Sequence, residues 1–145
     1  MFRYSIKGAD FVPLGDEVTQ LKNYLLIQSI RFPGRFLVEY DITPEAEQCG
    51  VIKFILQPVV ENSIHHAFGI RRERDFLKIS AWVEDEDLII TIYDDGCGIK
   101  AEKTAELNRM LRATRANTLL GEGAEGIGLA NVNARLKNFY GEECG

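Results

Sequence analysis

The feature that most constrains this fold is a pair of apolar segments joined by a short acidic turn. The first, "FLKISAWV" (76–83), alternates apolar and polar side chains, and the second, "DLIITIYD" (87–94), follows the turn "EDED". Alternation with a period of two, followed by a polar turn and a second apolar run, is typical of an antiparallel hairpin. The sequence therefore predicts two paired strands, and the second of them runs directly into "DDGCG".

Helical periodicity occurs in three other segments. Apolar side chains recur every three to four residues over 16–32, 51–69 and 126–141, which is the spacing of one helix face. The 51–69 segment is apolar on all sides, so we expect it to be largely buried. Pro58 inside it marks either a kink or the first turn of the true helix. Gly141 is placed to end the last helix.

The remaining segments connect these elements. Residues 36–42, "FLVEYDI", are expected to form a strand, and a loop is expected over 44–50. Residues 1–14 resemble a terminal piece interrupted by Gly and Pro. The polar segment 100–125 is expected to form a short helix within a mobile loop. Long loops in compact domains are often lids, so this segment is a candidate lid. A disordered insertion is the competing interpretation.

Charge and cysteine content exclude several classes of protein. A length of 145 residues fits one domain, and a net charge of -5 argues against a nucleic-acid-binding domain. The three cysteines have no metal-binding spacing, so we expect reduced thiols in a reducing cytosol. No apolar run approaches the length of a membrane span.

Polar residues interrupt the apolar helix at "ENSIHHAF", which contains Glu61, Asn62, His65 and His66. Burying an unpaired Asn costs about 1–3 kcal/mol, so Asn62 needs a partner. It either caps the helix end or supplies an oxygen ligand to Mg²⁺, which prefers carbonyl and carboxylate oxygens together with phosphates. The histidine pair as a transition-metal site is a weaker alternative, since adjacent helical side chains diverge by about 100°.

The end of the hairpin, Asp94 to Gly98, has the composition of either a plain turn or a ligand site. An ionised Asp94 at a strand end can accept a hydrogen bond from an exocyclic amine. Glycines at 96 and 98 allow a flat ring to approach the backbone.

A glycine cluster, "GEGAEGIGLAN" (121–131), directly precedes the last helix. Backbone N–H groups at a helix N-terminus bind phosphate through unpaired donors and the macrodipole. The cluster matches neither a Walker loop nor a dinucleotide-binding fingerprint. Glycines also punctuate ordinary loops, so the cluster alone does not establish a phosphate site.

The order of these pieces resembles the GHKL ATP-binding family, which includes histidine kinases and gyrase-type ATPases, and within it the LytS-like sensor histidine kinases. "VPLGDEVTQLKNYLLIQSIRFPGRF" is similar to that subfamily's "VPL..E...L..YL.IQ..RF", and "LQPVVENSIHHAF" to its "LQPLVENAIKHG". "DDGCGI" stands where "DNGPGI" is usual, and "GIGLANVNARLKNFYG" where "GIGL.NV..RL...YG" is usual. The resemblance covers nearly the whole chain.

The resemblance implies an α+β fold, a two-layer sandwich of a mixed, mostly antiparallel sheet with helices on one face. It implies ATP and Mg²⁺ as cofactors, with Asn62 as the metal ligand, Asp94 as acceptor for the adenine amine, and 100–125 as the ATP lid. The ATP-binding residues it implies are Asn62, His65, His66, Asp94, Gly96, Gly98, Ile99, Gly126, Ile127, Gly128 and Leu129.

Departures from the family pattern refine the expected chemistry. Gyrase-type ATPases carry a water-activating glutamate four residues before the metal Asn, where this chain has Pro58, so transfer to a protein side chain is favoured. Glu61 adjoins Asn62 and is the one candidate for a catalytic assist. His65 replaces a common Lys, which exchanges a permanent charge for a group that ionises near neutral pH. Cys97 replaces a Pro, which should loosen the turn.

The expected protein is thus the catalytic domain of a two-component sensor kinase, with two alternatives: a GHKL-type ATPase, or a degenerate nucleotide-binding module that only docks a partner. Residues 1–14 would be the tail of an upstream dimerisation helix and a linker, and 15–145 the ATP-binding domain, lacking its last strands. The phosphoacceptor His would lie upstream, so the fragment should not autophosphorylate. Expected partners are its own dimerisation domain, a second copy and a response regulator, at the cytoplasmic side of a membrane-bound sensor.

Overall fold

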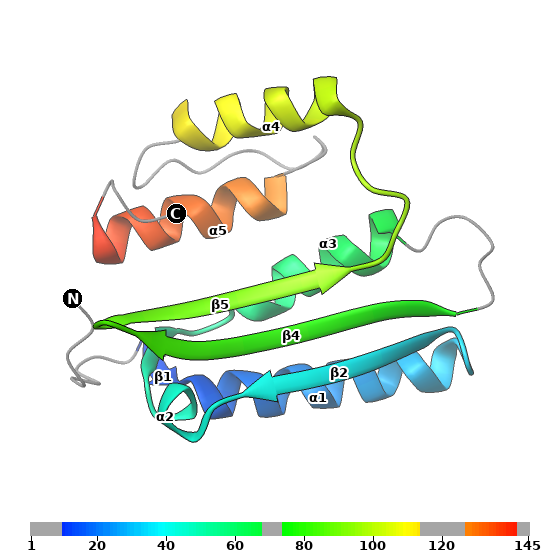
Figure 1. Ribbon diagram of the computed structural model, residues 1–145, viewed down its shortest axis with the longest axis horizontal. Helices are drawn as coiled ribbons and strands as arrows, with labels where there is room; N and C mark the ends of the chain where they lie inside the picture. Colours follow the sequence, from blue (N-terminus) through cyan, green and yellow to red (C-terminus); the bar gives the residue numbers. More distant parts are fainter. Residues whose placement is uncertain (1–9, 68–73, 114–126, 142–145) are drawn as a thin grey trace. The chain divides into compact units, whose positions relative to one another are not determined.

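The computed structural model describes residues 10–67, 74–113 and 127–141, which form two compact units divided between Gly96 and Cys97. Figure 1 shows the order of helices and strands along the chain.

The first unit is built on a three-stranded mixed sheet. Its strands are β2 (Phe36–Ile42), β4 (Asp75–Glu84) and β5 (Asp87–Asp94), in the order β2-β4-β5. Strands β4 and β5 form the predicted antiparallel hairpin, with Leu77 opposite Asp94 at its open end. Strand β2 runs parallel to β4, which requires a crossover connection.

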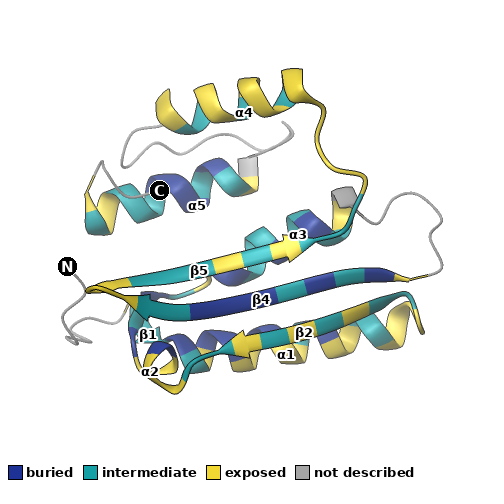
Figure 2. Cartoon of the chain, viewed as in Figure 1, coloured by how far each residue is buried: buried dark blue, intermediate teal, exposed yellow. Residues whose placement is uncertain are grey.

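Helices cover one face of this sheet. Helices α1 (Leu14–Arg31) and α3 (Leu56–Ala67) lie on the same side of the strands in Figure 1, and α3 packs against β5. Strand β4 is the most buried strand of the sheet in Figure 2, and the alternate residues Leu77, Ile79 and Ala81 are at most 1% exposed. Their spacing of two is the reason that one face of the strand is core. The α+β architecture with a mixed sheet is confirmed.

A second, two-stranded sheet corrects two sequence predictions. Strand β1 (Phe11–Pro13) pairs antiparallel with β3 (Gly50–Ile52), so part of the expected terminal piece and the first residues of the expected 51–69 helix are strands. Helix α3 begins only at Leu56. Pro58 therefore lies in its first turn, where a missing N–H costs nothing, and the kink alternative is wrong.

The turn between β3 and α3 also differs from expectation. Phe54, predicted on the buried helix, is 55% exposed and has a left-handed backbone with φ 58°.

The expected 44–50 loop contains a short helix, α2 (Pro44–Glu47). The Thr43 hydroxyl caps this helix by accepting a hydrogen bond from the Ala46 N–H at 3.3 Å. This N-cap satisfies a donor that the first helical turn leaves open.

The second unit contains α4 (Ala101–Ala113) and α5 (Ile127–Tyr140). Side chains of α5 cap the end of α4: Asn133 Nδ2 and Lys137 Nζ donate to the Leu111 carbonyl at 2.7 and 3.1 Å. Gly141, at φ 104°, donates to the Lys137 carbonyl at 2.9 Å, which confirms the predicted helix end. Helix α4 is longer than the short helix expected over 100–125, and residues 114–126 lie outside the described chain. No helix among the described residues combines the length and apolarity of a bilayer crossing.

Candidate functional site

A buried carboxylate organises the turn that leads into α3. Glu17 of α1 is 4% exposed, and its two oxygens accept hydrogen bonds from the Phe54 and Ile55 N–H groups at 2.8 and 3.1 Å. These donors precede the helix and have no carbonyl partner within it. Sequence reasoning gave Glu17 no partner. It missed this contact because the partners are 37 and 38 residues away.

Helix α3 presents Glu61 and Asn62 on different flanks. Leu56, Val60 and Ser63 are buried and share the core-facing side. Glu61 accepts a hydrogen bond from Gln57 Nε2 at 2.8 Å.

The charge of Glu61 also reaches α1. Burial raises the pKa of Tyr24 above its ordinary value, and the Glu61 charge raises it further. Helices α1 and α3 are in contact, and the next residue on α3, Asn62, is rotated from Glu61 by about 100°. Asn62 is half-buried. A catalytic assist by Glu61 stays a prediction, and one of its oxygens is already bonded to Gln57.

The two histidines lie in the last turn of α3. His65 is exposed, and the side chain of His66 lies outside the description. Within the part of the chain that the structure describes, there is no group of three or more His, Cys, Asp or Glu side chains that could hold a metal ion.

Asp94 is the last residue of β5 and lies on the helix-covered face of the sheet. Its partner on β4 is Leu77, which is fully buried. Residues opposite each other on paired strands point to the same face of the sheet. Asp94 Oδ1 accepts a hydrogen bond from the Gly96 N–H at 3.1 Å, which is the local turn typical of Asp. A carboxylate has about four acceptor positions, so the half-buried Asp94 can accept a further bond from a ligand.

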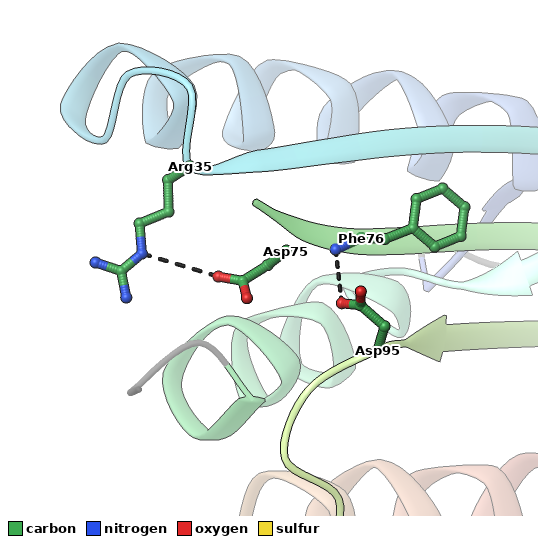
Figure 3. A network of polar contacts seen from close by, with 4 residues as sticks. All are labelled: Arg35, Asp75, Phe76 and Asp95. Atoms are coloured by element: carbon green, nitrogen blue, oxygen red, sulfur yellow. Dashed lines mark hydrogen bonds and ion pairs between the residues drawn. The ribbon is translucent and has the colours of Figure 1, made fainter. Parts of the chain in front are cut away.

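Asp95 has a different role from its neighbour. Its Oδ1 accepts a hydrogen bond from the Phe76 N–H at 2.7 Å, and its own N–H donates to the Phe76 carbonyl at 3.1 Å (Figure 3). The carboxylate thus extends the pairing of β4 and β5 by one more contact. This explains the two adjacent aspartates at the end of β5. Asp95 holds the strand end against β4, and Asp94 remains on the sheet face shared with α3.

An ion pair lies at the same end of the sheet. Arg35 Nε is 3.8 Å from Asp75 Oδ2, and Asp75 is 1% exposed (Figure 3). The Asp75 N–H also donates to the Arg35 carbonyl at 2.8 Å. These contacts join the start of β2 to the start of β4, and β4 in turn holds the end of β5.

The turn after Asp95 requires a glycine at one position. Gly98 has φ 70°, a left-handed backbone that side chains disfavour. A Cβ at this position would have no atom within 4 Å, so the dihedral angle and not a close approach explains the glycine. Cys97 and Ile99 are exposed.

The predicted phosphate site at the start of α5 is only partly described. Ile127 is the first residue of the helix, Gly128 is exposed and Leu129 is half-buried. Gly126 and the rest of the cluster before it lie outside the described residues.

Comparison with known proteins gives two kinds of similarity. A family model described as "Histidine kinase-, DNA gyrase B-, and HSP90-like ATPase" matches residues 51–144. Similar proteins include the Sensor protein LytS of Staphylococcus haemolyticus, 33% identical over 99% of this chain and 24% of its own length. The Sensor proteins LytS of Enterococcus faecalis and Bacillus subtilis are 32% and 31% identical over 98% and 99% of this chain, and each is covered over 23% of its length. The chain thus spans about a quarter of these relatives.

Proposed function

This chain belongs to the family of histidine kinase-, DNA gyrase B- and HSP90-like ATPases, and from that premise we propose that it binds ATP·Mg²⁺ as the catalytic domain of a sensor histidine kinase. The observation that carries the proposal is the position of Asp94. It ends β5 on the sheet face that also bears α3, the helix of Asn62.

Asp94 is the residue we assign to adenine. An ionised carboxylate accepts hydrogen bonds and donates none, so it selects a base edge that carries an amine. The next residue, Asp95, holds the end of β5 against β4, because its Oδ1 accepts a hydrogen bond from the Phe76 N–H at 2.7 Å. A carboxylate held in one orientation binds its partner more tightly than a mobile one, because less conformational entropy is lost on binding.

Asn62 is the residue we assign to Mg²⁺. The ion usually binds through one or two protein oxygens together with waters and substrate phosphates. A half-buried amide oxygen on α3 fits that donor set. When bound, Mg²⁺ neutralises charge on the phosphates during transfer.

Phosphoryl transfer to a protein side chain fits this chain better than hydrolysis. The position from which related ATPases activate water is Pro58, in the first turn of α3, and proline has no group that accepts a proton. The nucleophile would be a histidine on an upstream dimerisation domain, and a response regulator would receive the phosphoryl group. We place this domain on the cytoplasmic side of a membrane-bound sensor, as part of a homodimer.

Calorimetric titration with ADP, with and without Mg²⁺, tests the proposal. We expect saturable binding that Mg²⁺ strengthens and that Asp94→Asn abolishes. Asp87→Asn is the matched control, since Asp87 begins the same strand and is exposed, and it should bind as the unsubstituted chain does. No binding at millimolar nucleotide, or equal binding by the Asp94→Asn variant, would refute the assignment.

A further inference from the structure

We propose that Glu17 is a positioning residue for the nucleotide site: from α1, its carboxylate sets the start of α3 and so the position of Asn62. The inference rests on the proposed function of Asn62 and adds a residue from a different helix.

The contact is specific for a carboxylate. Both Glu17 oxygens are used, one on the Phe54 N–H at 2.8 Å and the other on the Ile55 N–H at 3.1 Å. The side chain is 4% exposed, so water does not compete effectively for these bonds. An amide of the same shape would turn one of the two acceptors into a donor facing an N–H group.

The turn that Glu17 holds is strained. Phe54 has φ 58°, and a non-glycine residue persists in this region only where the surroundings hold it. Phe54 is 55% exposed. Its N–H donates to Glu17, and this bond connects the strained turn directly to α1.

Helix α1 is anchored in the core, which fixes the position of Glu17. Leu14, Val18, Leu21 and Leu25 are buried on its core side, each at most 3% exposed. The Leu14 N–H donates to the Cys49 carbonyl at 2.8 Å, just before strand β3. Helices α1 and α3 are in contact, and the Glu17 hydrogen bonds place one of their connections at the start of α3.

A shift at the start of α3 also shifts Asn62. From Ile55 to Asn62 there are two turns, a rise of about 10 Å, and a helix segment of this length moves as a unit. Binding of a metal–phosphate group depends on ligand position to within about 1 Å. Release of the Glu17 contact should therefore impair the Mg²⁺-dependent part of nucleotide binding more than the adenine-dependent part, which depends on Asp94.

The test compares ADP affinity with Mg²⁺ and with a chelator in Glu17→Gln. The Mg²⁺ increment is the ratio of ADP affinity with Mg²⁺ to ADP affinity with the chelator, and it should exceed one in the unsubstituted chain. In Glu17→Gln this increment should fall by about tenfold, while the affinity measured with the chelator changes little. Asp16→Asn is the matched control, because Asp16 is the exposed neighbour on the same helix and loses the same charge. Its increment should be unchanged. In an Asn62→Ala background, Glu17→Gln should have no further effect on the increment.

The outcomes separate this inference from the proposed function. If the unsubstituted chain shows no increment with Mg²⁺, the proposed function fails. If it does and Glu17→Gln keeps the full increment, or loses affinity equally with and without Mg²⁺, the positioning role is overturned. Should Glu17→Gln fail to fold, amide hydrogen exchange of the unsubstituted chain decides: exchange of the Phe54 and Ile55 amides should slow with Mg²⁺·ADP and not with ADP alone. Unchanged exchange would overturn the proposal.

Discussion

Replacement of Asp95 by alanine tests whether the two adjacent aspartates divide structural and binding roles. The substitution removes the carboxylate that accepts the Phe76 N–H at 2.7 Å. A hydrogen bond to a charged group contributes about 1.5–3 kcal/mol. Asp95 is half-buried, so water can replace part of this bond, and we expect the lower end, about 1.5 kcal/mol of unfolding free energy. For a chain of this size that lowers Tm by about 3–6 °C.

Urea unfolding followed by fluorescence of Trp82 measures this change. Trp82 is the single tryptophan and lies on β4, the strand that Asp95 fastens. The midpoint should fall while the slope of free energy against urea stays constant, because the same surface is exposed on unfolding. ADP binding at a temperature well below Tm should persist with reduced affinity.

Asp94→Asn should give the opposite pattern. It keeps an oxygen that can accept the Gly96 N–H, now at 3.1 Å, so stability should change by less than about 0.5 kcal/mol while ADP binding is lost. The reasoning is refuted if Asp95→Ala leaves the urea midpoint unchanged. It is also refuted if Asp95→Ala abolishes ADP binding as completely as Asp94→Asn does.

Three further predictions concern single residues. Alkylation followed by mass spectrometry should label exposed Cys97 quickly and Cys49 only after unfolding, because burial of Cys49 raises the pKa of its thiol and shields it; equal rates would contradict this. Gly98→Ala should cost about 1 kcal/mol of stability, measured by urea unfolding, since φ is 70° there; a stabilised variant would argue against a left-handed turn. His65→Lys should raise ADP affinity in calorimetric titration, because it restores a permanent positive charge at the position where the family commonly has a Lys; an unchanged affinity would contradict a role of this position in phosphate binding.

Local patterns predicted the elements whose reasons are local. The alternation in 76–83, the acidic turn and the apolar run 87–94 define a hairpin without help from the rest of the chain, and β4 and β5 match it. The last helix was placed to within one residue at its start, and Gly141 ends it with the expected left-handed backbone. In both cases the determining interactions lie within a few residues along the chain.

The segment 51–69 shows where such reasoning fails. Its apolar character suggested one long helix, yet Val51 and Ile52 pair with β1, so their burial comes from a strand and not from a helix. A short apolar run has no periodicity that separates these two cases. The helix start at Leu56 depends on Pro58 in the first turn and on a carboxylate from another helix.

By itself, then, the sequence determined the hairpin and the helices with clear periodicity, and it suggested the residues of the proposed nucleotide site: Asp94 with its glycines, and Asn62 on an apolar helix. Only the tertiary structure decided that Glu17 holds the turn before α3, 37 residues away, and that Asp95 bonds to Phe76, 19 residues away. The physical reason is that a carboxylate can satisfy any N–H donor that the fold brings near it. Sequence spacing shows which side chains need a partner, and packing selects the partner.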